Sequence, residues 1–158
     1  MDTEPNSPVP ADIAESSPTD AVPYLGFVVG SELYGLPLSR LREVAKLTRL
    51  RRIPGTPSGM AGVINVRGEL VCALDAHVIL DRPEHERGDA GYLIALRGFD
   101  YPVGLVVDTI ADIFPIDPTT VDAPPTAWPD GRRACVSGTT SVRLGFIALL
   151  DVDRMVKR

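Results

Sequence analysis

From Tyr24 onward the chain is built from short apolar runs, each interrupted by glycine, proline or a polar pair. Runs this short suit β-strands and are too short for stable helices, so they predict a mostly β protein. A polar pair, Ser31-Glu32, beside Gly30 predicts a hairpin between the first two runs. The runs that predict strands are 24–30, 33–38, 62–66, 70–74, 91–97, 101–108, 109–116, 133–142 and 143–151. The runs within 91–116 predict a meander, and the last two predict a closing hairpin.

About nine or ten short strands with few helical turns favour an antiparallel barrel or sandwich. Two small five-stranded barrels account for this count, with a division near residues 81–90. A short helix is predicted over Ser39–Lys46, with Ser39 as its N-cap, and another over the last residues from Asp151. Four prolines between Asp117 and Gly131 predict a long irregular loop, which also holds the lone Trp128.

The net charge of −5 arises entirely in residues 1–22, which carry five acidic residues and no Lys or Arg. This segment is also rich in proline and serine, so it has little apolar surface to offset an ordering entropy of roughly 1–2 kcal/mol per residue. We expect a disordered acidic leader over 1–22 and a single domain over 23–158. The leader has neither the basic nor the apolar region of a signal peptide, and no apolar run reaches membrane-spanning length, which predicts a soluble, cytoplasmic protein.

Residues suited to catalysis or metal binding are few. Cys72 and Cys135 form no CxxC motif, and no recognised catalytic motif occurs. His85 lies in a charged loop and His77 follows a predicted strand, so solvated or capping roles are expected for both. Several aspartates lie at strand ends or helix starts, where Asp commonly caps, although a hydrolase that uses them is a rival hypothesis. We therefore expect no enzyme activity, no cofactor and no metal. The aspartates concerned are Asp108, Asp112, Asp151 and Asp153.

The basic run over residues 40–52 raises an alternative function, because small β-barrels often bind nucleic acid. Its cations alternate with apolar residues as on an ordinary half-buried surface, and the folded part carries no net positive charge. A solvated face is therefore the preferred interpretation, and a nucleic-acid-binding barrel is kept as the alternative.

An arginine interrupts the apolar stretch GVINVRGELVCALD (62–75). A hairpin turn over Val66-Arg67-Gly68-Glu69 explains it, because Gly68 supplies a positive φ and Arg67 then projects at the tip. A buried arginine would need a partner, since an isolated buried charge costs several kcal/mol. Three interpretations of Arg67 stay open: recognition of a partner, an ion pair with Glu69, or a cap on a neighbouring carbonyl. Asn65 is either part of a recognition site or a turn-stabilising amide.

The block from Pro54 to Val71, P-x-x-P-x-x-x-x-G-V-I-N-V-R-G-E-L-V, resembles the CheW family of bacterial chemosensory adaptors. The resemblance extends to three further blocks in the same order, FVVGSELYGLPLSRLREV (27–44), VGLVVDTIADI (103–113) and GFIALLDVDRMV (145–156). One departure is Asp75-Ala76-His77, where the family usually carries Asp-Leu.

The resemblance implies two SH3-like β-barrels packed together and a non-catalytic adaptor. Its partners would be the cytoplasmic tip of methyl-accepting chemotaxis receptors and the regulatory domain of a CheA-type histidine kinase, within membrane-associated arrays. Residues of the short helix predicted over Ser39–Lys46 and of the Arg67-Gly68 hairpin would contact the receptor. Three residues of the strand predicted over 101–108 are candidates for the kinase contact, although core packing is the more common role for each of these three. The implied interaction residues are Leu41, Glu43, Val44, Asn65, Arg67, Gly68, Val103, Leu105 and Val107.

Overall fold

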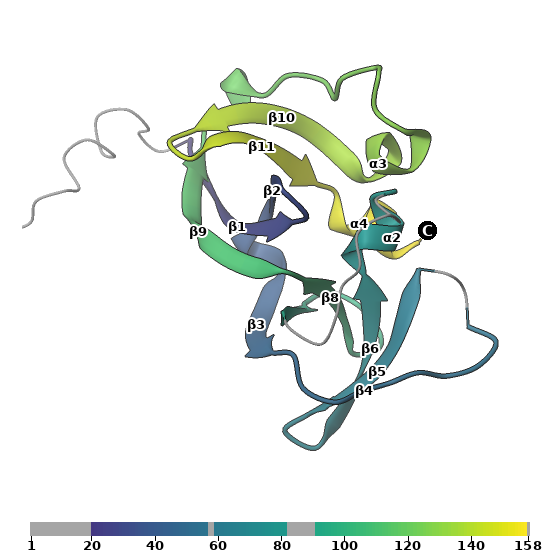
Figure 1. The fold of residues 1–158 in the computed structure, drawn as a ribbon. Helices are drawn as coiled ribbons and strands as arrows, with labels where there is room; N and C mark the ends of the chain where they lie inside the picture. Colours follow the sequence, from purple (N-terminus) through teal and green to yellow (C-terminus); the bar gives the residue numbers. More distant parts are fainter. Residues whose placement is uncertain (1–19, 57–58, 82–90, 158) are drawn as a thin grey trace, which may run out of the picture.

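The fold was obtained as a computed structural model, which describes residues 20–56, 59–81 and 91–157. The predicted leader lies mostly outside the described residues, and the first strand begins at its last residue, Val22. His85 also lies outside them. The chain forms two β-sheets joined by short helices, which confirms the predicted all-β class (Figure 1).

The first sheet has five strands in the order β10-β11-β2-β1-β9, and the second has six in the order β3-β7-β8-β6-β5-β4. All neighbouring strands are antiparallel except two parallel pairs, β11 with β2 and β6 with β8. The strands are β1 (Val22–Val29), β2 (Glu32–Pro37), β3 (Leu41–Lys46), β4 (Leu50–Arg51), β5 (Met60–Val66), β6 (Glu69–Asp75), β7 (Tyr92–Leu96), β8 (Val103–Val107), β9 (Thr109–Ile116), β10 (Val136–Val142) and β11 (Gly145–Leu150). The helices are η1 (Leu38–Arg40), α2 (Ala76–Ile79), η2 (Pro118–Thr120), α3 (Asp130–Cys135) and α4 (Val152–Val156).

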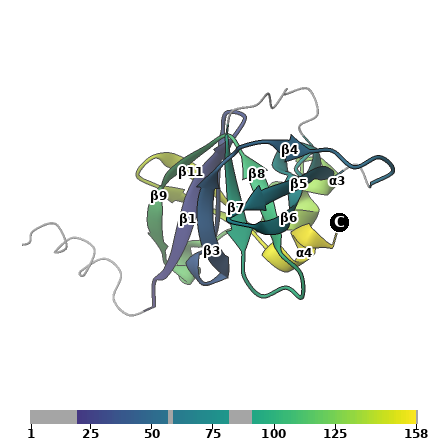
Figure 2. The ribbon, with the colours of Figure 1, turned by 90° about the horizontal axis from the view of Figure 1, so that it is seen from below.

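The sequence suggested a division of the chain near residues 81–90. The two sheets do not divide the chain there. The N-terminal hairpin β1–β2 joins the C-terminal strands, because β1 pairs with β9 and β2 pairs with β11. The expected meander is also interrupted, since β7 and β8 pair in the second sheet while β9 crosses to the first. The sheets are therefore interleaved in sequence, as the colours of Figure 2 make visible.

The helix predicted over Ser39–Lys46 is wrong. Only Leu38–Arg40 forms a 3-10 turn, and Leu41–Lys46 forms β3, along which half-buried and exposed side chains alternate. That period of two fits a strand, and pairing with β7 satisfies its backbone groups. The start of the predicted closing hairpin is also corrected, because Asp130–Cys135 forms α3 and the strand begins at Val136. The terminal helix is confirmed as α4, with Asp151 as its N-cap.

Two small apolar clusters lie one in each sheet, and a larger shared core joins the two sheets. It contains Phe27 and Leu36 from the first sheet and Ile94 and Leu105 from the second, all fully buried, together with residues of α2 and α4. Because interiors are packed at nearly crystalline density, such a shared core holds the two sheets as one rigid body. None of the helices in the described part of the chain is long and apolar enough to cross a membrane.

Candidate functional site: a surface built from β3 and the β5–β6 turn

The β5–β6 hairpin closes through the two-residue turn Arg67-Gly68, as predicted. Both residues have positive φ, 52° at Arg67 and 87° at Gly68, which is the backbone of the turn that matches the twist of paired strands. The side chain of the exposed Asn65 accepts a hydrogen bond from the backbone N–H of Gly68 at 2.8 Å, so Asn65 does stabilise the turn. Arg67 projects from the tip, and its side chain is 78% exposed.

Two ion pairs join this turn to β3. Arg67 pairs with Glu43, and Arg42 pairs with Glu69 at 2.6 Å. The local pair between Arg67 and Glu69, one of the interpretations left open by the sequence, does not form, because each residue takes its partner from β3. In the order of the sheet β7 and β8 separate β3 from β6, so these contacts require the sheet to curl upon itself. The curl brings together two blocks that lie more than twenty residues apart in sequence.

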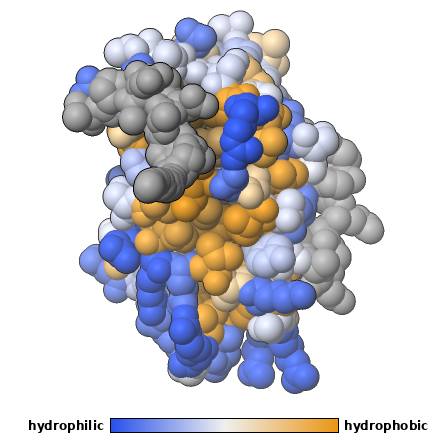
Figure 3. Space-filling model, turned by 90° about the vertical axis from the view of Figure 1, so that its left-hand side faces the viewer, coloured by the Kyte–Doolittle hydropathy of each residue, from blue (hydrophilic) through white to orange (hydrophobic). Residues whose placement is uncertain are grey.

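An exposed apolar face adjoins this region. Figure 3 shows apolar side chains gathered over the side of the molecule along which β9, β1 and β3 run. Each of these strands contributes one large exposed apolar residue, Ile113 (49% exposed), Val22 (39%) and Val44 (37%). Leu41, also on β3, is half-buried and packs against the shared core. The structure thus brings Glu43 on β3 to Arg67 of the β5–β6 turn, whereas Val44, the next residue of β3, is exposed on the opposite face of the strand.

The three residues suggested for a kinase contact lie elsewhere. Val103, Leu105 and Val107 are at most 1% exposed and belong to the shared core. Strand β8 is covered on both faces, because it lies in the interior of its sheet and every one of its residues is buried. These side chains offer no surface to a partner, so their role here is core packing.

The basic run over residues 40–52 does not form one continuous cationic row. Arg40 makes two hydrogen bonds of 3.0 Å to the carboxylate of Asp153, and Arg42 pairs with Glu69. The remaining cations, Lys46, Arg49, Arg51 and Arg52, are exposed along β3, β4 and their connection. No observation favours the nucleic-acid alternative.

His77 is buried rather than solvated, which corrects one of the two roles expected from sequence. It lies in α2 and is 2% exposed, and its Nε2 is 2.9 Å from Oδ1 of Asp108. The other oxygen of Asp108 accepts the backbone N–H of Gly30 at 2.7 Å. This arrangement links α2, which follows β6 of the second sheet, to the β1–β2 turn of the first sheet. Asp75 caps α2 by accepting the backbone N–H of His77.

The other aspartates weighed as acid or base candidates have structural partners. Asp151 caps α4, Asp153 pairs with Arg40, and Asp112 pairs with Arg143. The pKa of Asp112 lies below its usual value, chiefly because its carboxylate accepts the backbone N–H of Ile113 and secondly because of Arg143. Within residues 20–56, 59–81 and 91–157, no group of three His, Cys, Asp or Glu is placed to hold a metal ion.

Sequence reasoning missed the pairing of Arg42 with Glu69 and the exposure of Leu70. Leu70 follows Glu69 on β6 and is 64% exposed, the most exposed of the large apolar residues in the described chain. Alternation along β6 was the available signal, because Leu70 faces away from Val71, which is buried.

Comparison with known proteins identifies the family of this chain. The family model described as "CheW-like domain" matches residues 23–158. The chain is 26% identical to the chemotaxis protein CheW of Helicobacter pylori over 88% of this chain and 84% of that protein. It is also 26% identical to the chemotaxis protein CheW of Treponema pallidum, over 82% of this chain and 78% of the relative.

A solved structure has a similar fold. The crystal structure of the scaffolding protein TtCheW from Thermoanaerobacter tengcongensis aligns with a TM-score of 0.72 and 25% sequence identity. The alignment covers 84% of this chain and 85% of that one. The chain therefore belongs to the CheW-like family.

Proposed function

We propose that this protein is a non-catalytic adaptor that couples methyl-accepting chemotaxis receptors to a CheA-type histidine kinase in a chemosensory array. The observation that carries the receptor side is the pairing of Arg67 with Glu43, which joins the β5–β6 turn to β3 in one exposed surface. The membership of residues 23–158 in the CheW-like family supports the same function.

The surface has the properties that a transient signalling contact needs. Arg67 at its tip is largely exposed, and Val44, which follows Glu43 on β3, adds an exposed apolar side chain that a helical partner can cover. The shared core holds this surface on a rigid body, so the second partner, the regulatory domain of the kinase, meets a fixed geometry. Contacts of this kind bury about 1,200 Å² or less, and several of them stabilise a lattice through avidity.

The location follows from the partners. A protein that joins receptor tips to a kinase acts in the cytoplasm and is recruited to the membrane by the receptors themselves. No catalytic step is part of this function, because positioning the kinase is sufficient. Arg67, Glu43, Val44 and Leu41 form the proposed receptor contact, and Asn65 and Gly68 hold the turn that presents Arg67.

Co-sedimentation tests the proposal directly. The protein is mixed with a receptor signalling fragment in membranes and with the CheA-type kinase of the same organism, and kinase autophosphorylation is measured in the pellet. We expect a ternary complex with raised kinase activity, and a weaker complex with Arg67→Ala. Arg97→Ala is the matched control, because Arg97 is also exposed but lies at the end of β7, outside the proposed contact.

Each result decides a different part of the proposal. Absence of a complex with every receptor and kinase of that organism would refute the adaptor function. A normal complex with Arg67→Ala would support the adaptor function but would show that the β5–β6 turn is not the receptor contact.

A further inference from the structure

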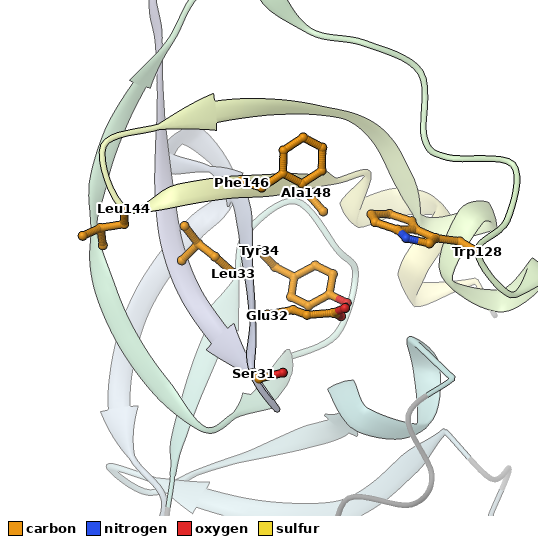
Figure 4. A pocket seen from close by; sticks show the side chains of 8 residues that line it. All are labelled: Ser31, Glu32, Leu33, Tyr34, Trp128, Leu144, Phe146 and Ala148. Atoms are coloured by element: carbon orange, nitrogen blue, oxygen red, sulfur yellow. The ribbon is translucent and has the colours of Figure 1, made fainter.

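A pocket of about 380 Å³ lies on the first sheet, away from the proposed receptor surface. It opens between the start of β2, strand β11 and the loop that precedes α3, and Figure 4 shows the rings of Tyr34, Phe146 and Trp128 around it. Its lining is mostly apolar. The lining residues are Ser31, Glu32, Leu33, Tyr34, Trp128, Leu144, Phe146 and Ala148.

The floor of the pocket is held in place by polar contacts. The hydroxyl of Tyr34, which is 1% exposed, donates to Glu32 at 2.7 Å, and Arg132 donates to the other oxygen of Glu32 at 3.3 Å. The guanidinium of Arg132 stacks over the indole of Trp128, 5.1 Å from the ring centroid, and its Nε donates to the carbonyl of Leu80 at 3.4 Å. The position of the indole is thus fixed before any ligand binds, which lowers the entropy cost of binding.

The rim of the pocket leaves large apolar side chains in water. Leu144 is 57% exposed and Phe146 is 54% exposed, and no segment of the described chain covers them. Covering exposed apolar area is favourable because it removes that area from water. A rigid, aromatic-lined groove of this kind is the feature by which proteins bind proline-rich segments, whose polyproline II conformation is already extended and ordered.

The chain itself carries such a segment. Residues 4–12, EPNSPVPAD, lie outside the described residues and hold Pro5, Pro8 and Pro10. A polyproline II helix has three residues per turn, so Pro5 and Pro8 would fall on the same side of it. We propose that residues 4–12 dock in this pocket as a polyproline II strand, with proline rings against Trp128 and Phe146.

The segment is acidic, because it is flanked by Glu4 and Asp12 and residues 1–19 contain no Lys or Arg. The arginines at the border of the pocket are paired within the fold, Arg132 with Glu32, Arg133 with Asp130 and Arg143 with Asp112. The apolar and aromatic lining, rather than charge, therefore carries the proposed contact.

The segment is long enough to reach the pocket. Strand β1 begins at Val22, and its far end leads into Ser31 and Glu32 at the pocket, about 25–30 Å away at 3.3 Å per residue. The twelve residue-to-residue steps from Pro10 to Val22 span up to about 40 Å when extended. Because the segment and the pocket belong to one chain, their effective concentration is in the millimolar range, so weak contacts suffice. A partner protein that uses this pocket would have to displace the segment.

Trp128 is the only tryptophan in the chain, so its fluorescence reports on the pocket directly. We compare the full chain with a chain that begins at Asp20. Docking predicts that Trp128 emits at a shorter wavelength and is quenched less by acrylamide in the full chain. The full chain with Pro5, Pro8 and Pro10 replaced by Ala should match the truncated chain, whereas Pro18→Ala, a proline outside the segment, should match the wild type.

A synthetic peptide of residues 1–19 locates the contact. Added to the truncated chain, it should shift the Trp128 emission saturably, and Phe146→Ala should abolish this shift. Ile113→Ala, which removes an exposed apolar side chain on β9, should bind the peptide as the wild type does. Identical emission and quenching in the full and truncated chains would overturn the proposal, as would equal peptide binding by Phe146→Ala.

Discussion

The guanidinium of Arg67, at the tip of the β5–β6 turn, forms an ion pair with the carboxylate of Glu43 on β3. The second pair between the same elements, Arg42 with Glu69, is reciprocal, because each element supplies one cation and one anion. Exposed ion pairs contribute only about 0–1 kcal/mol to stability. The importance of this pairing is therefore geometric, since it orients the Arg67 side chain on the proposed receptor surface.

Exchanging the charges of Arg67 and Glu43 distinguishes the effect of the ion pair from the effect of Arg67 on receptor recognition. In the double variant Arg67→Glu with Glu43→Arg the pair can form in reverse, so the free energy of unfolding should stay within about 0.5 kcal/mol of wild type. Receptor coupling should remain lost, because a binding hot spot contributes about 2 kcal/mol or more through its own contacts. Co-sedimentation and urea unfolding measure the two effects, and restored coupling in the double variant would mean that the pair itself, rather than Arg67, is what matters.

The apolar side of the contact is tested at Val44. Val44→Ser should weaken co-sedimentation with the receptor fragment and leave stability nearly unchanged, because the side chain is already 37% exposed. Tyr101→Ser is the control, since Tyr101 is 50% exposed on the β7–β8 connection. An equal loss of binding in both variants would contradict a specific contact at β3.

The β5–β6 turn depends on the amide of Asn65. Asn65→Ala removes the acceptor for the backbone N–H of Gly68 and should lower the free energy of unfolding by about 0.5–1.5 kcal/mol. Ser141→Ala on the exposed face of β10 should change it by less than about 0.5 kcal/mol. Urea denaturation measures both, and equal stability of the two variants would show that solvent replaces the Asn65 bond without loss.

Two glycines that face each other across β1 and β2 should differ in their tolerance of a methyl group. A Cβ at Gly26 would lie 2.4 Å from a ring carbon of the buried Phe114, whereas at Gly35 it would meet the end of the Ile147 side chain at 2.9 Å. A buried aromatic ring has little room to move, so Gly26→Ala should cost about 1–3 kcal/mol and more than Gly35→Ala. Thermal unfolding ranks the two, and the reverse order would contradict the packing around Phe114.

The pairing of Asp153 with Arg40 makes stability depend on pH in a defined direction. Hydrogen bonds from Arg40, and then the positive charges of Arg40 and Lys157, hold the pKa of Asp153 below its usual value. In the unfolded chain this pKa is about 3.9, so ionised Asp153 stabilises the fold above that pH, and its contribution is lost as pH falls through the lower folded value.

Comparison with Asp153→Asn tests this dependence. The variant should be less stable than the wild type near neutral pH, and the difference should narrow below about pH 4. Asp130→Asn, at a fully exposed carboxylate, should show no such narrowing. A difference between the wild type and Asp153→Asn that stays constant on acidification would contradict the contribution of the ionised pair.

Local sequence determined the features that depend on neighbouring residues. The hairpin tip at Arg67-Gly68 was predictable because glycine accepts positive φ and the flanking runs are apolar and β-branched. The closing hairpin and the cap of α4 at Asp151 were predictable for similar reasons, since turn and cap chemistry lies within a few residues of chain. The four motif blocks also predicted the family, which the comparisons confirmed.

Tertiary structure decided what depends on distant segments. Residues 41–46 carry apolar side chains at a spacing that also suits a helix, and pairing with β7 made them a strand. The division of the chain between the sheets, the burial of His77 beside Asp108 and the choice of Glu43 as the partner of Arg67 all join residues more than twenty positions apart. Spacing along the chain carries no information about such contacts, because the curl of the sheets and the shared core bring them about only when the whole domain folds.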